Sequence, residues 1–162
     1  MKAKKITILS LFCSAALIMS YIEALIPLPL PFGIKVGLPN IIIVFILCRV
    51  GAKETIAVSL VRVLMVALLF GNALSLLYSV AGALLSLTFM IVLKALKTFS
   101  TIGISVVGGI THNAGQIIVA CIVMDTVQIS YYLPILAISG IIAGVLVGIA
   151  GDMLIKKFPK II

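Results

Sequence analysis

Six apolar runs, joined by short segments, cover most of the chain and limit its fold more than any other feature. They span residues 6–26, 38–50, 55–71, 73–96, 102–124 and 133–155. Most of them have about the length of a helix that crosses a bilayer, roughly 20 residues. With 64% hydrophobic and only 10% charged residues, the chain carries too little charge for a soluble domain. We therefore predict an all-α membrane protein, a compact bundle of six transmembrane helices that forms one domain over residues 1–162.

The positions of the basic residues predict the topology. The second run is only about 20 Å long as a helix, whereas the hydrocarbon core is about 30 Å thick, so this run either spans the membrane or re-enters it. If all six runs span and the N-terminus is inside, ten of the 12 basic residues lie in the cytoplasm, and only Lys35 and Arg62 do not. The positive-inside rule favours this arrangement. We therefore predict a multi-pass protein of the plasma membrane with both termini in the cytoplasm.

The net charge of +8 does not indicate a nucleic-acid binder. Such proteins gather basic residues on one exposed face, whereas here they stand singly or in small groups between apolar runs. We predict membrane lipid as a partner, and no nucleic acid. Cys13, Cys48 and Cys121 lie within or at the end of apolar runs without the spacing of a metal site, so we interpret them as small buried hydrophobic residues.

The fifth run contains the stretch "GGITHNAGQ", which places three hydrogen-bonding side chains among small and apolar residues. His112 and Gln116 are one helical turn apart, and Asn113 lies close to both. Small residues on one helix face are typical of helix packing, and polar side chains there often join neighbouring helices. Each of the three groups also needs a partner in a medium of low dielectric constant. That partner is either another helix or a bound molecule.

Arg62 is the second anomaly, because it lies near the middle of the third run. A charged side chain at this depth costs at least about 2.5 to 3.5 kcal/mol on insertion scales. The sequence has four acidic residues, of which Glu23 has the most suitable position for an internal ion pair. The alternative is that Arg62 faces a bound anionic ligand.

Further polar residues fall in the outer half of the predicted bundle. The first external loop, "IPLPLPFGIKVGLPN", contains four prolines and is either a stiff connector or a lid, with Lys35 as a gating residue. No comparable cluster occurs in the cytoplasmic half. We therefore predict an outward-facing pocket for a small polar or anionic molecule. The candidate substrate-binding residues are Glu23, Lys35, Asn40, Arg62, Asn72, Tyr78, His112, Asn113 and Gln116.

Two stripes of small residues at intervals of four predict close helix contacts. One stripe lies in the sixth run, at Gly140, Gly144 and Gly148, and the other lies in the first run, at Ala16, Ser20 and Ala24. Packing within the chain explains both stripes. The alternative is that one of them faces another membrane subunit, and we take Ala16, Ser20 and Ala24 as the candidate partner contact.

The sequence offers little for catalysis. It lacks a P-loop, has one histidine, and has two aspartates 27 positions apart, so neither a nucleotide site nor a zinc or magnesium site is predicted. No serine or cysteine has an evident base in the sequence. We therefore predict no catalytic residues, no metal and no cofactor, and a chain that is not an enzyme by itself.

Three motifs, "KVGLPNI", "GNALSLLYSVAGALLS" and "GGITHNAGQ", resemble those of the bacterial Gx transporter family, also known as heptaprenyl diphosphate synthase component I. In general shape this family resembles the substrate-binding S components of energy-coupling-factor (ECF) transporters. That resemblance implies capture of a vitamin-like solute, together with a transmembrane coupling protein and two cytoplasmic ATPases. S components often carry an Ala-x-x-x-Ala contact motif on the first helix, where this chain has Ala16, Ser20 and Ala24.

The leading hypothesis is therefore an S-component-like, substrate-binding membrane subunit for uptake of a small vitamin-like or anionic solute. The alternative is a non-catalytic membrane subunit of heptaprenyl diphosphate synthase in menaquinone side-chain synthesis. Prenyl diphosphate synthases use Asp-rich motifs that hold Mg²⁺, so another chain would have to supply that chemistry. A third hypothesis is a purely structural subunit whose polar residues serve only packing.

Overall fold

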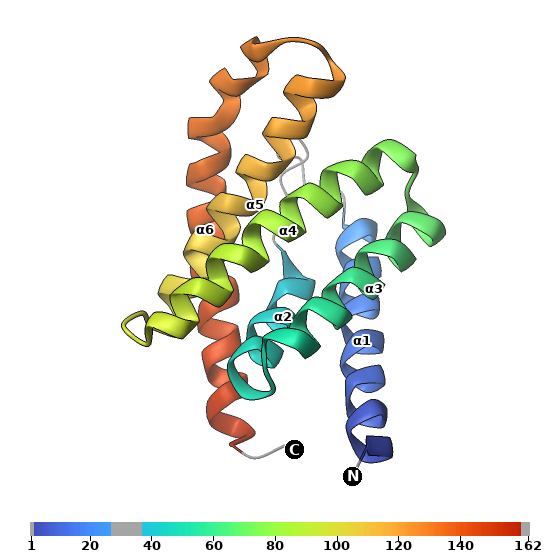
Figure 1. Cartoon of the computed structure of the whole chain (residues 1–162), viewed down its shortest axis with the longest axis vertical. Helices are drawn as coiled ribbons and strands as arrows, with labels where there is room; N and C mark the ends of the chain where they lie inside the picture. The colour runs from blue at the N-terminus through green and yellow to red at the C-terminus, as the bar shows by residue number, and fades with distance from the viewer. Residues whose placement is uncertain (1, 27–36, 160–162) are drawn as a thin grey trace.

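A computed structural model of the chain describes residues 2–26 and 37–159. The described residues form six α-helices and one short 3-10 helix, without a strand (Figure 1). The elements are α1 (Lys2–Leu25), α2 (Leu38–Arg49), α3 (Ala52–Phe70), α4 (Ala73–Leu96), α5 (Thr101–Val123), η2 (Val127–Tyr132) and α6 (Leu133–Lys157). The predicted all-α membrane bundle is confirmed. The helix ends lie within a few residues of the predicted ones.

Local sequence signals explain several of these helix ends. Pro39 lies in the first turn of α2, where its missing N–H is not needed. Asn72 begins α4 with a capping box, in which its side chain accepts a hydrogen bond from the Ser75 N–H and the Ser75 hydroxyl accepts one from the Asn72 N–H. Ser100 caps α5 in the same manner, by accepting from the Gly103 N–H.

The outer surface of the bundle is apolar. Four helices, α1, α4, α5 and α6, are long and apolar enough to cross a membrane. Although α3 carries three charged residues, its outer face is also apolar, with Leu68 76% exposed. Large exposed apolar surfaces of this kind are stable in lipid and not in water. The protein is therefore embedded in the membrane.

The helices form two groups that α2 joins. One group contains α4, α5 and α6, which pack side by side, and the other contains α1 and α3 (Figure 1). In addition, α2 contacts both groups, and α3 contacts α4. Over α2, seven of the 12 residues are buried, with Ile46 and Leu47 inaccessible to solvent. At about 1.5 Å per residue, α2 is about 18 Å long and reaches only part of the way across a bilayer.

Most of the small-residue stripe on α1 packs inside the chain, and a partner contact of this stripe stays a prediction. Ala16 is inaccessible and belongs to the core that contains Ile42 and Ile46 of α2. Ser20 is buried as well, and its hydroxyl donates to the Ala16 carbonyl at 2.8 Å. Ala24, the last member, is exposed and lines a cavity. Two of the three residues are thus inaccessible to another subunit.

The glycines of α5 and α6 bring these helices into backbone contact. A Cβ atom built on Gly144 would lie 2.6 Å from the Cα of Val106, and one on Gly148 would lie 2.7 Å from the Cα of Ile102. One on Gly140 would lie 2.9 Å from the carbonyl of Gly109. The stripe on α6 therefore packs within the chain, as the first reading of this stripe predicted.

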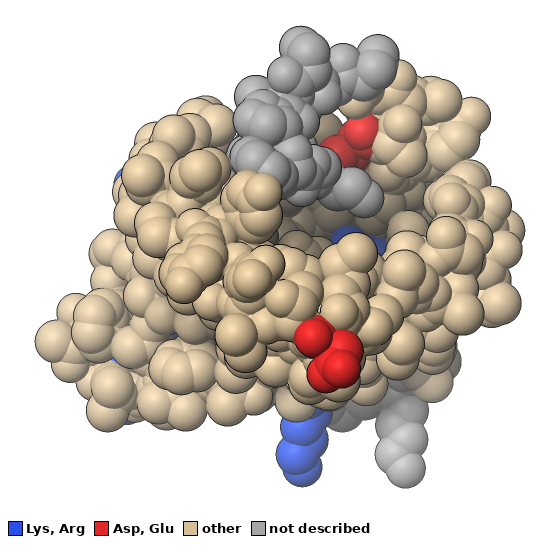
Figure 2. Space-filling view, turned by 90° about the horizontal axis from the view of Figure 1, so that it is seen from above, with Lys and Arg blue, Asp and Glu red and all other residues tan. Residues whose placement is uncertain are grey.

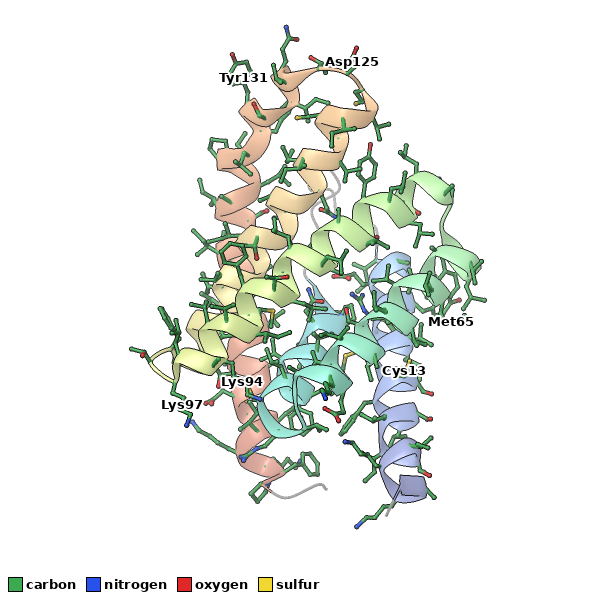
Figure 3. The ribbon with its side chains drawn as sticks, in the orientation of Figure 1. Cys13, Met65, Lys94, Lys97, Asp125 and Tyr131 are labelled. Atoms are coloured by element: carbon green, nitrogen blue, oxygen red, sulfur yellow. The ribbon has the colours of Figure 1, made fainter. Side chains whose placement is uncertain are left out.

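Basic side chains hold the end of the bundle where both termini lie (Figure 1). Lys5 of α1 pairs with Glu54 of α3, and Arg49 donates to the Ile155 carbonyl of α6 at 2.6 Å. Lys94 donates to the carbonyl of Leu47 near the C-terminus of α2, where a positive charge also meets the negative end of the helix dipole. Asp125 and Tyr131 lie at the opposite end (Figure 3).

Candidate functional site

A cavity of about 310 Å³ lies among the helices, and all six contribute to its wall. Its volume is at the lower end of the range for small-molecule sites, about 300–1,000 Å³. Seen from the end far from the termini, the molecule is hollowed, and basic atoms are visible deep inside the hollow (Figure 2). The polar residues that line the cavity are Ser20, Glu23, Asn40, Ser59, Arg62, Ser75, Ser79, Ser86, Ser105, His112, Asn113, Gln116 and Ser139.

Arg62 is the one lysine or arginine among the described lining residues. It lies on α3 one turn after Ser59, between the buried side chains of Ser59 and Val63. Its Nε atom is buried and has no hydrogen-bond partner among the described residues. A buried guanidinium nitrogen without a partner is costly, so this charge needs an explanation beyond packing.

Glu23 has its own structural role. Its Oε1 atom accepts hydrogen bonds from the backbone N–H groups of Gly37 and, at 3.3 Å, Leu38. These groups stand at the start of α2, where the positive end of the helix dipole favours a carboxylate. Within the described part of the chain, no ion pair joins Glu23 to Arg62. The predicted pair between these residues is therefore absent, although Glu23 is near enough to attract the arginine electrostatically.

The three polar side chains of α5 take different positions. Asn113 donates from Nδ2 to the carbonyl of Leu136 at 2.6 Å and lies 3.4 Å from the hydroxyl of Ser139, so its amide joins α5 to α6. His112 packs against α4, because a Cβ atom on Gly82 would lie 2.9 Å from its Cε1 atom. Gln116 lines the cavity one turn further on. Contacts between helices therefore explain the positions of Asn113 and His112, whereas Gln116 faces the cavity.

Six of the nine predicted site residues line the same cavity: Glu23, Asn40, Arg62, His112, Asn113 and Gln116. Two do not. Asn72 is exposed and caps α4 through its Oδ1 atom, 2.8 Å from the Ser75 nitrogen, and Tyr78 is absent from the described lining. Lys35 and most of the proline-rich loop lie outside the described residues, so the choice between lid and connector stays open.

The serines are the lining residues that the prediction mostly missed. Seven of them face the cavity, from α1, α3, α4, α5 and α6. The available signal is spacing, since Ser75, Ser79 and Ser86 recur on one face of α4. That signal is weak, because a serine in a membrane helix also satisfies itself by donating to the preceding turn, as Ser20 does.

The described residues of the cavity wall offer one cation, several hydroxyls and a few amides, which are groups that bind and orient a molecule. Among residues 2–26 and 37–159, no three His, Cys, Asp or Glu side chains come together as a metal site would require. Apolar side chains of Ile43, Val63, Phe70 and Leu87 complete the wall. A wall that combines many polar groups with apolar side chains can bind and orient a small organic ligand.

Comparison with known proteins identifies the family. Searches of the curated proteins and of the solved structures found no match, so the likeness to ECF S components stays a prediction. The sequence model for heptaprenyl diphosphate synthase component I matches residues 12–154, which include α2 to α5 in full and most of α1 and α6. The match covers far more than half of the 162 residues, and the chain therefore belongs to the heptaprenyl diphosphate synthase component I family.

Proposed function

We propose that this chain is a non-catalytic, membrane-embedded subunit of heptaprenyl diphosphate synthase that serves menaquinone side-chain synthesis. The family match over residues 12–154 is the observation that carries this proposal. A partner synthase, not this chain, performs the chemistry. The bundle crosses the plasma membrane several times and keeps its basic end, with both termini, in the cytoplasm, where it meets that partner.

The positions of the two aspartates support a non-catalytic role. Magnesium sites for phosphate chemistry use carboxylates that lie close together. Asp125 follows α5 at one end of the bundle (Figure 3), whereas Asp152 lies near the end of α6 and pairs with Lys156 at 2.7 Å. The stretch of α6 from Leu133 to Asp152 alone rises about 28 Å. These carboxylates cannot hold one metal ion together, so the partner supplies the acidic motifs.

Deletion of the gene tests this function. The expected result is a loss or shortening of the menaquinone side chain, measured by mass spectrometry of extracted quinones, with rescue by the wild-type gene. A soluble prenyl diphosphate synthase is expected to co-purify with the tagged chain from detergent-solubilised membranes. Deletion cells with quinones of normal length, and a tagged chain without a synthase, would contradict the proposal.

The second candidate is an S-component-like subunit that binds a small vitamin-like or anionic solute for uptake. The cavity favours it, because all six helices contribute to the wall and Arg62 lies inside. On this hypothesis a transmembrane coupling protein and cytoplasmic ATPases supply the energy. Deletion cells are then expected to lose uptake of one solute while their quinones stay normal, and the tagged chain is expected to capture ATPases. Unchanged growth on every tested vitamin and organic acid as limiting nutrient would reject this candidate.

A further inference from the structure

We infer that the cavity binds one small molecule that carries a single negative charge, a carboxylate or a phosphate diester, and that Arg62 holds this charged group. This inference deepens the binding role of the second candidate and rests on it. On this inference, Arg62 binds a singly charged anion in preference to a diphosphate.

The guanidinium of Arg62 has donors available inside the cavity. A guanidinium offers five donors in a planar fork that matches an oxyanion. Within the described part of the chain, neither a hydrogen bond nor an ion pair engages this fork, and Nε is buried. By contrast, Arg49 donates to a carbonyl, and Lys5 and Lys156 pair with carboxylates. Among the described residues that line the cavity, Arg62 is the basic one, and it keeps donors for an outside molecule.

The described wall of the cavity carries one charge of each sign. Arg62 contributes one positive charge, and the remaining charged residue of the described wall is Glu23. The Glu23 carboxylate already accepts from two backbone N–H groups at the start of α2. A ligand with one negative charge would balance Arg62. A diphosphate would bring further negative charge into a region of low dielectric constant, near Glu23 and without a second cation among the described wall residues.

The volume of the cavity and the residues of its wall also limit the kind of ligand. At about 30 Å³ for each water-sized group, a cavity of this volume holds on the order of ten such groups. This space fits a small solute or a lipid headgroup. Serine hydroxyls of α3 and α4, such as Ser59 and Ser79, offer hydrogen bonds beside the charge, and Val63 and Leu87 offer apolar contact. The ligand is therefore a compact monoanion with both polar and apolar parts.

The test is a binding titration of the purified full-length chain in lipid nanodiscs, with sodium benzoate, dimethyl phosphate and inorganic diphosphate as probes. The wild type is expected to bind at least one of the two monoanions more tightly than diphosphate. Benzoate and dimethyl phosphate also separate the two sources of the charge. Arg62→Gln is expected to weaken this binding about 10- to 100-fold, as loss of a charge-assisted hydrogen bond does.

Arg49→Gln is the matched control, because it removes the same charge at a site that does not line the cavity, and it is expected to bind as the wild type does. If Arg62→Gln does not give folded protein, Arg62→Lys replaces it. This variant keeps the charge without the planar fork and is expected to bind several-fold more weakly. The inference is overturned if diphosphate binds more tightly than both monoanions, if the Arg62 variant binds equally well, or if the wild type binds none of the probes.

This experiment and the tests of function fail separately. Normal uptake in deletion cells would reject the transport role. The affinity for monoanions measured in the titration, and its dependence on Arg62, would still stand. Conversely, a wild-type chain that binds no probe would overturn the inference without changing the quinone profile or the partners captured.

Discussion

Replacing Arg62 by methionine is expected to raise the stability of the ligand-free protein by about 2 kcal/mol. A buried charge that is not fully hydrogen-bonded loses more hydration than it regains, and apolar replacement of such groups is often stabilising by about 1–4 kcal/mol. Arg62 fits this description, because its buried Nε has no partner among the described residues and its fork makes no ion pair there. Methionine is flexible enough to fill the space beside Val63.

The measurement is the free energy of unfolding in SDS titration or the thermal midpoint, with protein freed of small molecules by extensive washing. Arg49→Met is the control, since Arg49 donates to the Ile155 carbonyl and its replacement is expected to cost about 1 kcal/mol. If Arg62→Met gains stability and loses ligand binding, then Arg62 is retained for function and not for stability. A structural Arg62 would behave in the opposite way, and a loss of more than about 1 kcal/mol in Arg62→Met would refute the ligand assignment.

Replacing Gly144 by valine is expected to destabilise the fold by about 3 kcal/mol or more. A Cβ atom at this position would lie 2.6 Å from the Cα of Val106 and 2.9 Å from the Ser105 carbonyl oxygen. Both are backbone atoms of α5, so the clash is relieved only if the two helices separate. Overpacking commonly costs about 1–3 kcal/mol, and here it also opens the adjacent contact of Gly140 with Gly109.

Gly103→Ala is the matched control for this prediction. A Cβ atom there would meet its nearest neighbour, the Ser100 hydroxyl oxygen, at 3.5 Å, which is an ordinary contact. Alanine in a helix is favoured over glycine by about 1 kcal/mol, so this variant is expected to be as stable as the wild type or slightly more so. Equal stability of Gly144→Val and the wild type would mean that α5 and α6 do not pack along this stripe.

The helices could be predicted from the sequence because a membrane forces each apolar run to satisfy its own backbone hydrogen bonds. Pro39, Asn72 and Ser100 are typical residues for the start of a helix, and each stands at or next to the start of one. The partners of each helix could not be predicted in the same way. A stripe of small residues predicts close packing without naming the neighbour. For this reason the sequence left open whether Ala16 and Ser20, which are buried in this chain, pack within it or against another subunit.

The residues that line the cavity could be predicted in part. Arg62 and the cluster on α5 stood out because burying charged and amide groups in a membrane costs free energy. These residues do line the same cavity. The sequence could not tell that Asn113 bonds to α6 or that Glu23 bonds to the start of α2, because both depend on which helices meet. Asn72 was predicted to bind the ligand, whereas its geometry is that of a helix cap.

The family and the cavity point to different ligands. Heptaprenyl diphosphate synthase, the enzyme in the family description, makes a long apolar chain with a highly charged head. The cavity is small, holds one unpaired cation among its described residues and is lined by serines. The two observations agree if the chain binds a compact monoanion in the membrane and any prenyl chemistry belongs to another subunit.

Native mass spectrometry of the wild-type chain, released directly from its own membranes, tests most directly whether the cavity holds a ligand at Arg62. The predicted spectrum shows one bound small molecule per chain, which fragments as a carboxylate or a phosphate ester. The adduct is expected to persist in Arg49→Gln and to fall about 10-fold or more in Arg62→Gln. A wild-type chain that carries no adduct, or an adduct of equal intensity in all three proteins, would contradict the account.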